Sequence, residues 1–378
     1  MKEILVKVGI KTHGQPLLKR YKDYTLLENM LIGDGFHWQK TLKVRLPGEV
    51  MELPEINDNE KDCRCIMGDN VSLLNIVPLE TYLECVVGSE MNPTAPFEFL
   101  KAHAVISRSW VLGKVRGAHP CDKNGQTDNA TTLVGWDDTG EHSRFDVCSD
   151  DHCQRYQGLQ VIPAVNKEAI GLTSGEVITD ETGNIVDARF SKCCGGRTEV
   201  FETCWQPLHV RCLDSVDDPW CDLSNFSPSE KLRVLKSVLK DYDLETDNYG
   251  YCWRVEISKD EIKDNLLNRF GRNIGEILKL EPLHRGVSGR IDLLRIHGSE
   301  GLLDLGKELW IRRLLSSSHL YSSAFEIEDS EASVVLNGKG WGHGVGLCQI
   351  GAANMALNGY SYQDILAFYY PGAILSKL

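Results

Sequence analysis

The pattern of apolar and polar residues predicts short strands at the N-terminal end of the chain. Alternating stretches occur at residues 4–10, 24–31 and 41–46, and glycines and prolines separate them. A charged patch at residues 55–62 interrupts this pattern and predicts an exposed loop. Residues 1–70 are therefore expected to form an N-terminal β region of a first lobe.

The next segment has helical periodicity instead. A first helix is predicted to begin near Pro78, because proline is favoured in a first turn. Its apolar stripe consists of Leu79, Tyr82, Leu83, Val86 and Val87. A second helix begins near Thr94 and Pro96 and is the best candidate for a central buried helix. Between the two helices, Glu90 is expected just beyond the end of the first.

Beyond residue 120 the pattern becomes mixed. Residues 120–225 are irregular and rich in Asp, Gly and Cys, which is typical of functional loops. Helices are predicted at residues 228–243, 259–270, 347–357 and 361–369, and strands at 289–298 and 332–337. This mixture predicts a second α+β lobe at about residues 225–335. The expected fold class is α+β, a mixed, β-rich, two-lobed arrangement with a few helices around a cleft.

Composition and charge remove two classes of function. The 378 residues are 42% hydrophobic without an apolar run of about 18 to 20 residues, so no transmembrane segment is expected. The formal net charge is -13, whereas nucleic acid binding depends largely on basic side chains that displace counterions from phosphates. Nucleic acid is therefore not an expected partner. An uncharged polymer such as a sugar chain is compatible with this charge.

The N-terminal residues lack the features of a secretory signal. Residues 1–9 alternate like a strand, and no basic segment precedes an apolar run of roughly 7 to 15 residues with a cleavage site. Either the sequence is a processed or trimmed form, or the protein acts inside the cell or leaves it by another route.

Thirteen cysteines are a high number for a cytosolic chain, and an odd number leaves at least one without a disulfide partner in the same chain. Cys85 and Cys348 lie in apolar surroundings and are predicted to pack in the core. Five others form a second cluster along the sequence: Cys193, Cys194, Cys204, Cys212 and Cys221. One or two disulfides are favoured over a metal site in this second cluster if the protein is exported.

Three separated segments resemble the SpoIID/LytB family (stage II sporulation protein D) and follow the family's order. The first comprises residues 77–91, VPLETYLECVVGSEM, and residues 100–109, LKAHAVISRS. The second is residues 190–199, FSKCCGGRTE, and the third is residues 340–352, GWGHGVGLCQIGA. Weaker agreement occurs at residues 288–290 and 369–372.

The resemblance covers about residues 70 to 378 and implies that residues 71–378 form a SpoIID/LytB-like domain. The sequence departs from the family pattern at Cys348, where Ser is usual. It also departs at Cys193 and Cys194, where small uncharged residues are common.

The resemblance implies that the protein is a peptidoglycan lytic transglycosylase and that Glu90, in the family's Glu-Met motif, is catalytic. Position alone favours a solvent-exposed carboxylate at a helix end, and the resemblance reverses this interpretation. Apolar neighbours generally favour a protonated carboxyl group, which can protonate a leaving glycosidic oxygen. No convincing second carboxylate is present, although an ordinary glycoside hydrolase requires one.

A lytic transglycosylase avoids this requirement because the substrate supplies the nucleophile. The 6-hydroxyl of N-acetylmuramic acid attacks its own anomeric carbon, so the MurNAc-GlcNAc β-1,4 bond is cut to give 1,6-anhydroMurNAc ends. The resemblance implies glycan strands already stripped of stem peptides as the substrate. One Glu then serves first as acid and then as base.

A segment rich in soft ligands predicts a metal site. Residues 142–156 concentrate His and Cys in one irregular loop, and imidazole and thiolate both suit Zn2+. The resemblance implies a zinc site of one His and two Cys close to the catalytic Glu, matched here by His142, Cys148 and Cys153. His152 is a competing imidazole. A disulfide between the two cysteines, or two free thiols, is the alternative.

Alternating glycines surround Trp341 and His343, and no Lys-Ser/Thr pair follows them, so a phosphate loop is not expected. Small residues let a backbone approach a ligand closely. Trp341 is therefore expected to stack on a sugar ring, and His343 to donate a hydrogen bond. A tight turn with a structural His is the alternative. Arg108, in the first segment of resemblance, is the third expected substrate-binding residue.

The resemblance also implies partners and a location. The expected partners are peptidoglycan glycan strands and a cell-wall amidase, and the expected location is the cell envelope, periplasmic or extracytoplasmic. LytB-type relatives imply an alternative function, a non-catalytic peptidoglycan-binding enhancer of an amidase. A glycoside hydrolase with an unrecognised second carboxylate is the third hypothesis.

Overall fold

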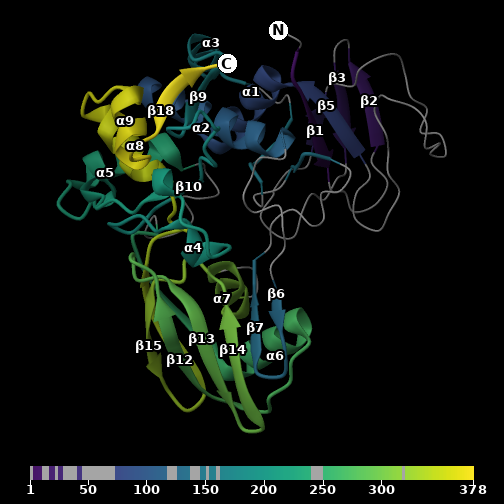
Figure 1. Cartoon of the computed structure of the whole chain (residues 1–378), viewed down its shortest axis with the longest axis vertical. Coiled ribbons are helices and arrows are strands. Elements are labelled where there is room, and N and C mark those ends of the chain that lie inside the picture. Colours follow the sequence, from purple (N-terminus) through teal and green to yellow (C-terminus); the bar gives the residue numbers. More distant parts are fainter. Residues whose placement is uncertain are drawn as a thin grey trace.

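The structure is a computed structural model of the 378-residue chain. It describes residues 3–10, 17–21, 24–28, 41–44, 73–116, 126–136, 145–149, 153–158, 162–239, 250–316 and 320–378. Figure 1 shows a helix-rich upper part and a sheet-rich lower part. The expected α+β fold class is confirmed by this combination of helices and mixed sheets.

The N-terminal strand belongs to the upper part. Strand β1 (Leu5–Ile10) pairs antiparallel with β5 (Leu73–Pro78) and parallel with β8 (Val147–Cys148). Three further strands, β2 (Leu17–Tyr21), β3 (Tyr24–Glu28) and β4 (Thr41–Val44), form a separate antiparallel sheet. The strands expected at 24–31 and 41–46 are therefore present in shorter form. The charged patch at 55–62 lies outside the described residues.

Helix α2 (Phe97–Val115) is the centre of the upper part, as expected from its apolar sequence. It packs against α1 (Leu79–Glu90), α3 (Ala164–Leu172), α8 (Gln349–Leu357) and α9 (Tyr362–Tyr369). The five residues of the predicted apolar stripe on α1 are all buried. Because these helices surround α2, its side chains are buried on nearly every side.

Short elements complete the upper part. These are β9 (Glu176–Thr179), β10 (Phe190–Ser191), α4 (Phe201–Cys204), η1 (Arg211–Leu213), η2 (Pro219–Cys221), α5 (Pro228–Val238), β17 (Leu347–Cys348) and β18 (Ile374–Lys377). Strand β10 pairs in parallel with β17, and β18 pairs antiparallel with β9. The two-residue strands β10 and β17 join segments that are far apart in the sequence.

The lower part contains a second hydrophobic core. One sheet has the order β12 (Ile277–Arg285), β13 (Ile291–Gly298), β14 (Gly301–Gly306), β7 (Thr132–Gly135) and β6 (Gln126–Asp128). A three-stranded sheet consists of β11 (Cys252–Ser258), β16 (Ser333–Lys339) and β15 (Phe325–Asp329). Helices α6 (Lys259–Phe270) and α7 (Glu308–Leu314) pack against these strands (Figure 1).

The second core does not follow a single stretch of sequence. It includes Leu133 from β7, which pairs in parallel with Leu305 of β14. Helix α5, inside the limits expected for the second lobe, instead buries Val234 and Val238 in the first core. The predicted domain boundaries at residues 70, 225 and 335 stay predictions.

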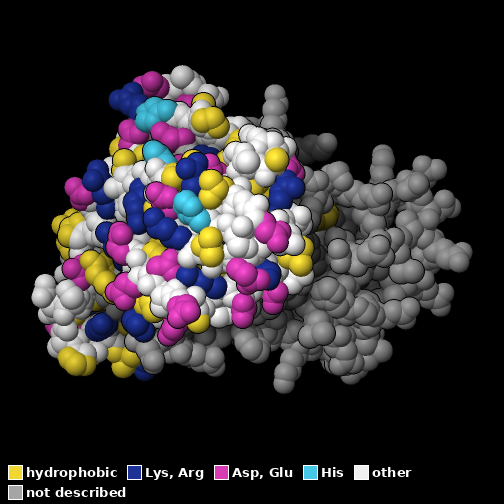
Figure 2. All heavy atoms as spheres, turned by 90° about the horizontal axis from the view of Figure 1, so that it is seen from below, with side chains coloured by type: hydrophobic (Ala, Val, Ile, Leu, Met, Phe, Trp, Pro, Cys, Tyr) yellow, Lys and Arg dark blue, Asp and Glu magenta, His cyan; other side chains and the backbone are white. Residues whose placement is uncertain are grey.

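One face of the molecule, seen from below, carries side chains of both charges. Figure 2 shows basic and acidic side chains interspersed over the described part of this face, with scattered apolar side chains. Among the described residues, no helix combines the length and the apolar character needed to cross a membrane.

Candidate functional site

Glu90 is the last residue of α1 and is 8% exposed. The prediction placed it just beyond this helix, so the helix extends slightly farther than expected. Its Oε1 accepts a hydrogen bond from the backbone N–H of Arg155, at 2.9 Å. In the part of the chain that the structure describes, no other hydrogen bond reaches the carboxylate. One oxygen is therefore held in place, and the other is left without a protein donor there.

A loop at residues 153–158 lies against the end of α1 and supplies the donor to Glu90. The ring of Tyr156 stacks on Tyr82, with centroids 5.6 Å apart and an interplanar angle of 10°. The backbone N–H of Gln157 donates to Ser89 Oγ at 2.9 Å. These contacts fix the loop on the helix that carries Glu90.

The same loop brings two predicted metal ligands together. The backbone N–H of Cys148 donates to Cys153 Sγ at 3.4 Å. Burial, and then the neighbouring Cys148 thiol, raise the pKa of Cys153 well above its usual value. Burial also raises the pKa of Tyr82, and the charges of Cys153, Cys148 and Glu90 add to this effect. The two thiols and the Glu90 carboxylate therefore all act on the pKa of one tyrosine.

The third predicted ligand, His142, and its competitor His152 lie outside the described residues. The zinc site of His142, Cys148 and Cys153 therefore stays a prediction, although its two sulfur donors are neighbours in the structure.

The glycine loop, residues 340–346, holds His343 in one tautomer. His343 Nδ1 accepts a hydrogen bond from the backbone N–H of Val345 at 3.0 Å, so in the neutral ring the proton is on Nε2. Its ring contacts Trp205 edge to face, with centroids 5.0 Å apart. Burial lowers the pKa of His343 well below its usual value, and the charges of Arg189 and Arg290 act in the same direction. The ring is therefore neutral near pH 7.

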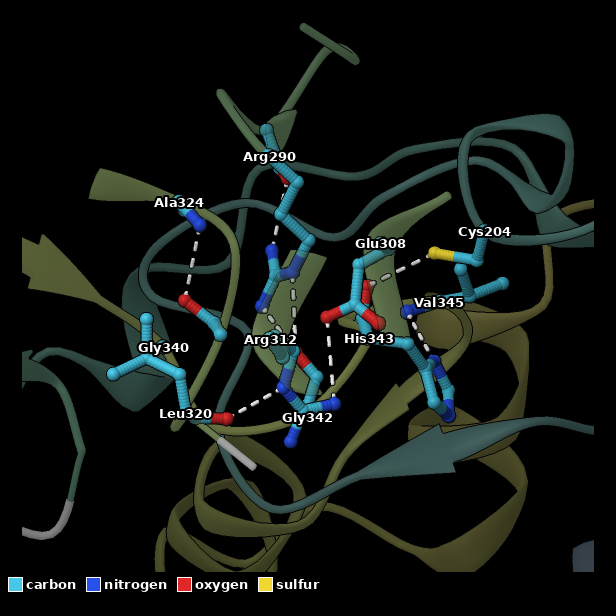
Figure 3. A network of polar contacts seen from close by, with 12 residues as sticks. Cys204, Arg290, Glu308, Arg312, Leu320, Ala324, Gly340, Gly342, His343 and Val345 are labelled. Atoms are coloured by element: carbon cyan, nitrogen blue, oxygen red, sulfur yellow. Dashed lines mark hydrogen bonds and ion pairs between the residues drawn. The ribbon is translucent and has the colours of Figure 1, made fainter. Parts of the chain in front are cut away.

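A buried arginine fastens the glycine loop to the lower part. Arg290 donates through Nε and Nη2 to the carbonyl of Gly342, at 3.1 and 3.0 Å. Figure 3 shows this contact beside His343 and the buried Glu308–Arg312 pair. Gly344 has φ +78°, and a Cβ built there would lie 2.5 Å from Arg290 Cζ. Glycine is therefore required where the arginine lies under the loop.

Glu199 completes this connection. Its carboxylate accepts hydrogen bonds from the Ser288 hydroxyl at 2.6 Å and from the Ser288 backbone N–H at 3.1 Å. Ser288 Oγ in turn accepts from Arg290 at 2.8 Å, and the Glu199 backbone N–H donates to the Gly344 carbonyl at 2.8 Å. The second and third segments of resemblance, and the weaker one at 288–290, thus meet in a single polar network.

Trp341, within the glycine loop, forms an isolated bridge with Cys193, two residues beyond β10. Its backbone exchanges hydrogen bonds with Cys193, at 2.7 and 3.1 Å. Its ring contacts Tyr321 edge to face at 5.3 Å, and Lys192 Nζ lies 5.9 Å from the ring centroid. The side chain is partly exposed, so part of the ring remains accessible.

Glu90 and His343 are not in direct contact. Across the described ranges, no hydrogen bond, ion pair or ring contact joins the two residues. Arg189 provides an indirect connection, because its guanidinium lies 4.2 Å from the ring of Trp205 and 5.9 Å from that of Trp110 on α2. The glycine loop therefore reaches the helical core through Arg189.

Arg108 is fully buried on α2, unlike a typical ligand-facing residue. It forms a bidentate pair with Glu80 on α1, at 2.9 and 2.7 Å, and donates to the Glu176 carbonyl at 3.0 Å. These bonds hold α1 and β9 on α2. Its predicted contact with substrate stays a prediction.

Sequence reasoning missed one cluster of functional groups. Cys194, Asp218, Cys221 and Cys348 are buried, and one donor atom of each lies within 4.8 Å of the others. Such a cluster has the composition and spacing to hold a metal ion. The disulfides expected among the cysteines at 193–221 are not formed, because these cysteines are free thiols in the structure.

Two sequence signals pointed to this cluster. Cys348 and the Cys193–Cys194 pair are the positions where the chain departs from the family pattern, and all three residues are buried here. The Asp218-x-x-Cys221 spacing also resembles that of paired zinc ligands. Cys348 is buried as expected, but it contacts other cysteine groups as well as apolar side chains.

A small pocket of about 90 Å³ lies elsewhere, where α9 meets the β9–β18 pair. Ile178, Leu366 and Leu375 are among its lining residues, and none of the predicted site residues lines it. This pocket is mainly apolar and does not suit a sugar chain.

Comparison with known proteins identifies two regions of this chain. Residues 67–179 match the family Stage II sporulation protein (SpoIID), and residues 199–346 match a domain of unknown function (DUF8618). The first region contains Glu90, Cys148 and Cys153, and the second extends from Glu199 to the end of the glycine loop.

Three relatives illustrate the similarity along most of the chain. Stage II sporulation protein D of Bacillus subtilis is 24% identical over 312 residues, covering 82% of this chain and 77% of the relative. An uncharacterized protein of Brachyspira hyodysenteriae is 26% identical over 304 residues, covering 80% of this chain and 68% of the relative. The amidase enhancer of Bacillus subtilis is 24% identical over 323 residues, covering 78% of this chain but only 40% of the relative. The segments of resemblance, the matched SpoIID region and these relatives agree, and together they show that the chain is similar to proteins of the SpoIID/LytB family.

Proposed function

We propose that this protein acts on the bacterial cell wall as a peptidoglycan lytic transglycosylase, with Glu90 as its catalytic residue. The SpoIID region and the amidase enhancer relative support a function in the cell wall. The observation that carries the proposal is the Glu90 carboxylate, nearly buried at a helix end and held, among the described residues, by one hydrogen bond through Oε1. Such a group has a fixed orientation and one oxygen available to a reacting atom.

The proposed reaction needs one carboxyl group and no water. Glu90 donates its proton to the glycosidic oxygen, and the bond from that oxygen to the muramic acid C1 breaks. The 6-hydroxyl oxygen of the same sugar forms a new bond to C1, and its proton passes to Glu90. The carboxyl group is restored, so one Glu acts as acid and then as base.

Zinc at Cys148, Cys153 and His142 belongs to this proposal. The two described sulfurs are adjacent, Cys148 is buried and Cys153 is half-buried, which suits a soft divalent ion. When bound, zinc would supply positive charge near the developing charge on the substrate. The protein's own contribution is the loop at residues 153–158, which positions the thiols and the donor to Glu90 together.

Trp341 and His343 are the proposed sugar contacts. The partly exposed indole of Trp341 can stack on a pyranose ring, and the neutral His343 lies in the same glycine loop. Arg108 is proposed to contribute by holding α1, and thereby Glu90, in place. The proposed substrate is peptide-stripped glycan, and the proposed location is the cell envelope.

Product analysis tests this function. Full-length protein with zinc is incubated with peptide-stripped glycan, and products are identified by mass spectrometry. The wild type is expected to release 1,6-anhydroMurNAc ends, and Glu90→Gln should reduce product formation at least about 100-fold, because general acid catalysis contributes about 10²- to 10⁴-fold. Glu84→Gln, on the same helix and only loosely paired with Lys167 at 3.9 Å, is the matched control and should retain activity.

Two outcomes would contradict the proposal. Reducing ends in place of anhydro ends would indicate a glycoside hydrolase with a second carboxylate. Equal activity of the wild type and Glu90→Gln would exclude Glu90 as the catalytic residue.

The similarity to an amidase enhancer favours a second function, a non-catalytic peptidoglycan-binding protein that stimulates an amidase. This function predicts glycan binding and amidase stimulation without anhydro products. Both properties would then survive in Glu90→Gln.

A further inference from the structure

A second group of soft donors lies in the upper part, where β10, β17 and η2 meet. Cys194, Asp218, Cys221 and Cys348 each offer one atom, and the four atoms lie within 4.8 Å of one another. None of the four residues is more than 1% exposed. We propose that they bind one zinc ion in a structural site, separate from the site at the end of α1 and independent of the proposed lytic activity.

The distances fit a single tetrahedral ion. Cys194 Sγ lies 3.3 Å from Cys221 Sγ and 3.2 Å from Asp218 Oδ2. Ligands at about 2.3 Å for sulfur and about 2.0 Å for oxygen would be about 3.8 Å and about 3.5 Å apart around tetrahedral zinc. These two pairs therefore need to separate by only a few tenths of an ångström to admit the ion, and the other pairs lie within 4.8 Å of one another. An iron–sulfur cluster would need its thiolates farther apart, because several irons and sulfides lie between them.

Backbone N–H groups already point at two of the sulfurs. The N–H of Gly196 donates to Cys221 Sγ at 3.1 Å, and the N–H of Cys194 donates to Cys348 Sγ at 3.3 Å. Hydrogen bonds of this kind stabilise thiolate ligands and orient them toward a metal. The backbone conformation thus favours sulfur atoms that act as acceptors.

The carboxylate is oriented in the same way. Asp218 accepts a hydrogen bond from the backbone N–H of Trp220 through Oδ1, at 3.0 Å, and from the Tyr369 hydroxyl through Oδ2, at 2.9 Å. Within the described segments, no lysine, arginine or histidine forms an ion pair with it. A buried carboxylate without a cationic partner is costly, and a divalent cation would supply the missing charge.

The nature of the donors selects the metal and its role. Three sulfurs and one carboxylate oxygen suit zinc, and four protein ligands leave no open position for water or substrate. A closed site of this type stabilises the structure and does not catalyse.

The ion would join segments that have little regular structure of their own. Strands β10 and β17 contain two residues each, and η2 contains three. Cys348 lies two residues beyond the glycine loop, and Cys193, next to Cys194, exchanges backbone hydrogen bonds with Trp341. The zinc ion would therefore fix the position of the glycine loop.

Metal analysis of the full-length protein tests the proposal. Protein produced with zinc is dialysed against metal-free buffer, and its zinc content is measured by plasma mass spectrometry. Cys221→Ser, Cys348→Ser and Asp218→Asn are each expected to lose one equivalent of zinc relative to the wild type. Cys252→Ser, an exposed cysteine outside the cluster, is the matched control and should lose none.

A second measurement does not require the cluster variants to fold. The double variant Cys148→Ser/Cys153→Ser leaves the cluster intact, and Co2+ is added to this protein as a spectroscopic probe. One equivalent of Co2+ should produce sulfur-to-cobalt charge-transfer absorption and the visible bands of a tetrahedral site.

Three results would overturn the proposal. These are an unchanged zinc content in all three cluster variants, the absence of a sulfur-to-cobalt band in the double variant, and a disulfide among the three cluster cysteines in alkylated, unreduced wild type.

Discussion

At the scale of single residues, burial sets the charge state of His103. This side chain is fully buried on α2, where Nδ1 lies 3.2 Å from Ser107 Oγ and Nε2 lies 3.2 Å from the Gln349 amide nitrogen. Burial, reinforced by the charge of Lys192, lowers the pKa of His103 from 6.5 to about 3. The folded protein therefore keeps this ring neutral in conditions where the unfolded chain protonates it.

This difference predicts a pH-dependent stability. Below about pH 6.5 the unfolded state binds a proton that the folded state does not bind. The free energy of unfolding should therefore decrease as the pH is lowered from about 6.5 to about 3. His103→Gln should reduce the slope by up to about 1.4 kcal/mol per pH unit, the value for one proton. Urea unfolding of both proteins between pH 7 and pH 4 measures this slope. Equal slopes in the wild type and His103→Gln would contradict the prediction.

The sequence identified residues whose role depends on local context, and it missed those whose role depends on distant partners. Glu90 was placed near a helix end because capping and periodicity are local. Glu199 and Arg290 lie in segments that resemble the family. Their hydrogen bonds, however, connect residues 199, 288–290 and 342–344, which are far apart in the sequence. The apolar neighbours of Cys348 in the sequence predict a core residue. Its polar contacts are instead with the distant Cys194 and the cluster around it.

At the scale of elements, local signals set helix limits well. Helix α6 covers the predicted residues 259–270, because Ser258 caps its start and Gly271, with φ +64°, ends it. The capping box of Ser361 and Asp364 likewise begins α9. Strands β10 and β17 could not be predicted, since two residues carry no periodicity and are strands only through their pairing.

The glycine loop provides a prediction at this scale. Gly344→Ala should destabilise the protein by about 3 kcal/mol or more, because it adds backbone strain to a clash with buried Arg290. Gly289→Ala has a similar positive φ but meets no atom within 4 Å, so only the strain of about 1 to 2 kcal/mol is expected. Chemical denaturation of both variants measures the difference. Equal losses of stability would show that the contact with Arg290 is unimportant.

At the scale of the whole molecule, the two large hydrophobic cores of the described residues predict partly independent stability. One core surrounds α2, and the other includes Leu294 of β13 between β12 and β14. Leu294→Ala should cost about 2 to 5 kcal/mol, the usual range for a buried leucine. Hydrogen exchange followed by mass spectrometry should then accelerate in β12–β14 while α2 stays protected. Equal acceleration in both parts would indicate one cooperative unit.

The parallel pairing of β7 with β14 has a consequence for how the protein is made. During translation, the hairpin of β6 and β7 leaves the ribosome long before residues 301–306 exist, so one edge of β7 has no partner in the meantime. Helices α1 and α2 are synthesised before this hairpin, whereas α8 and α9, which also pack on α2, follow β14, so neither core can be completed while the hairpin waits. Until β14 is synthesised, the free edge of β7 can pair with strands of other chains. We therefore expect a chaperone to bind this hairpin during that interval.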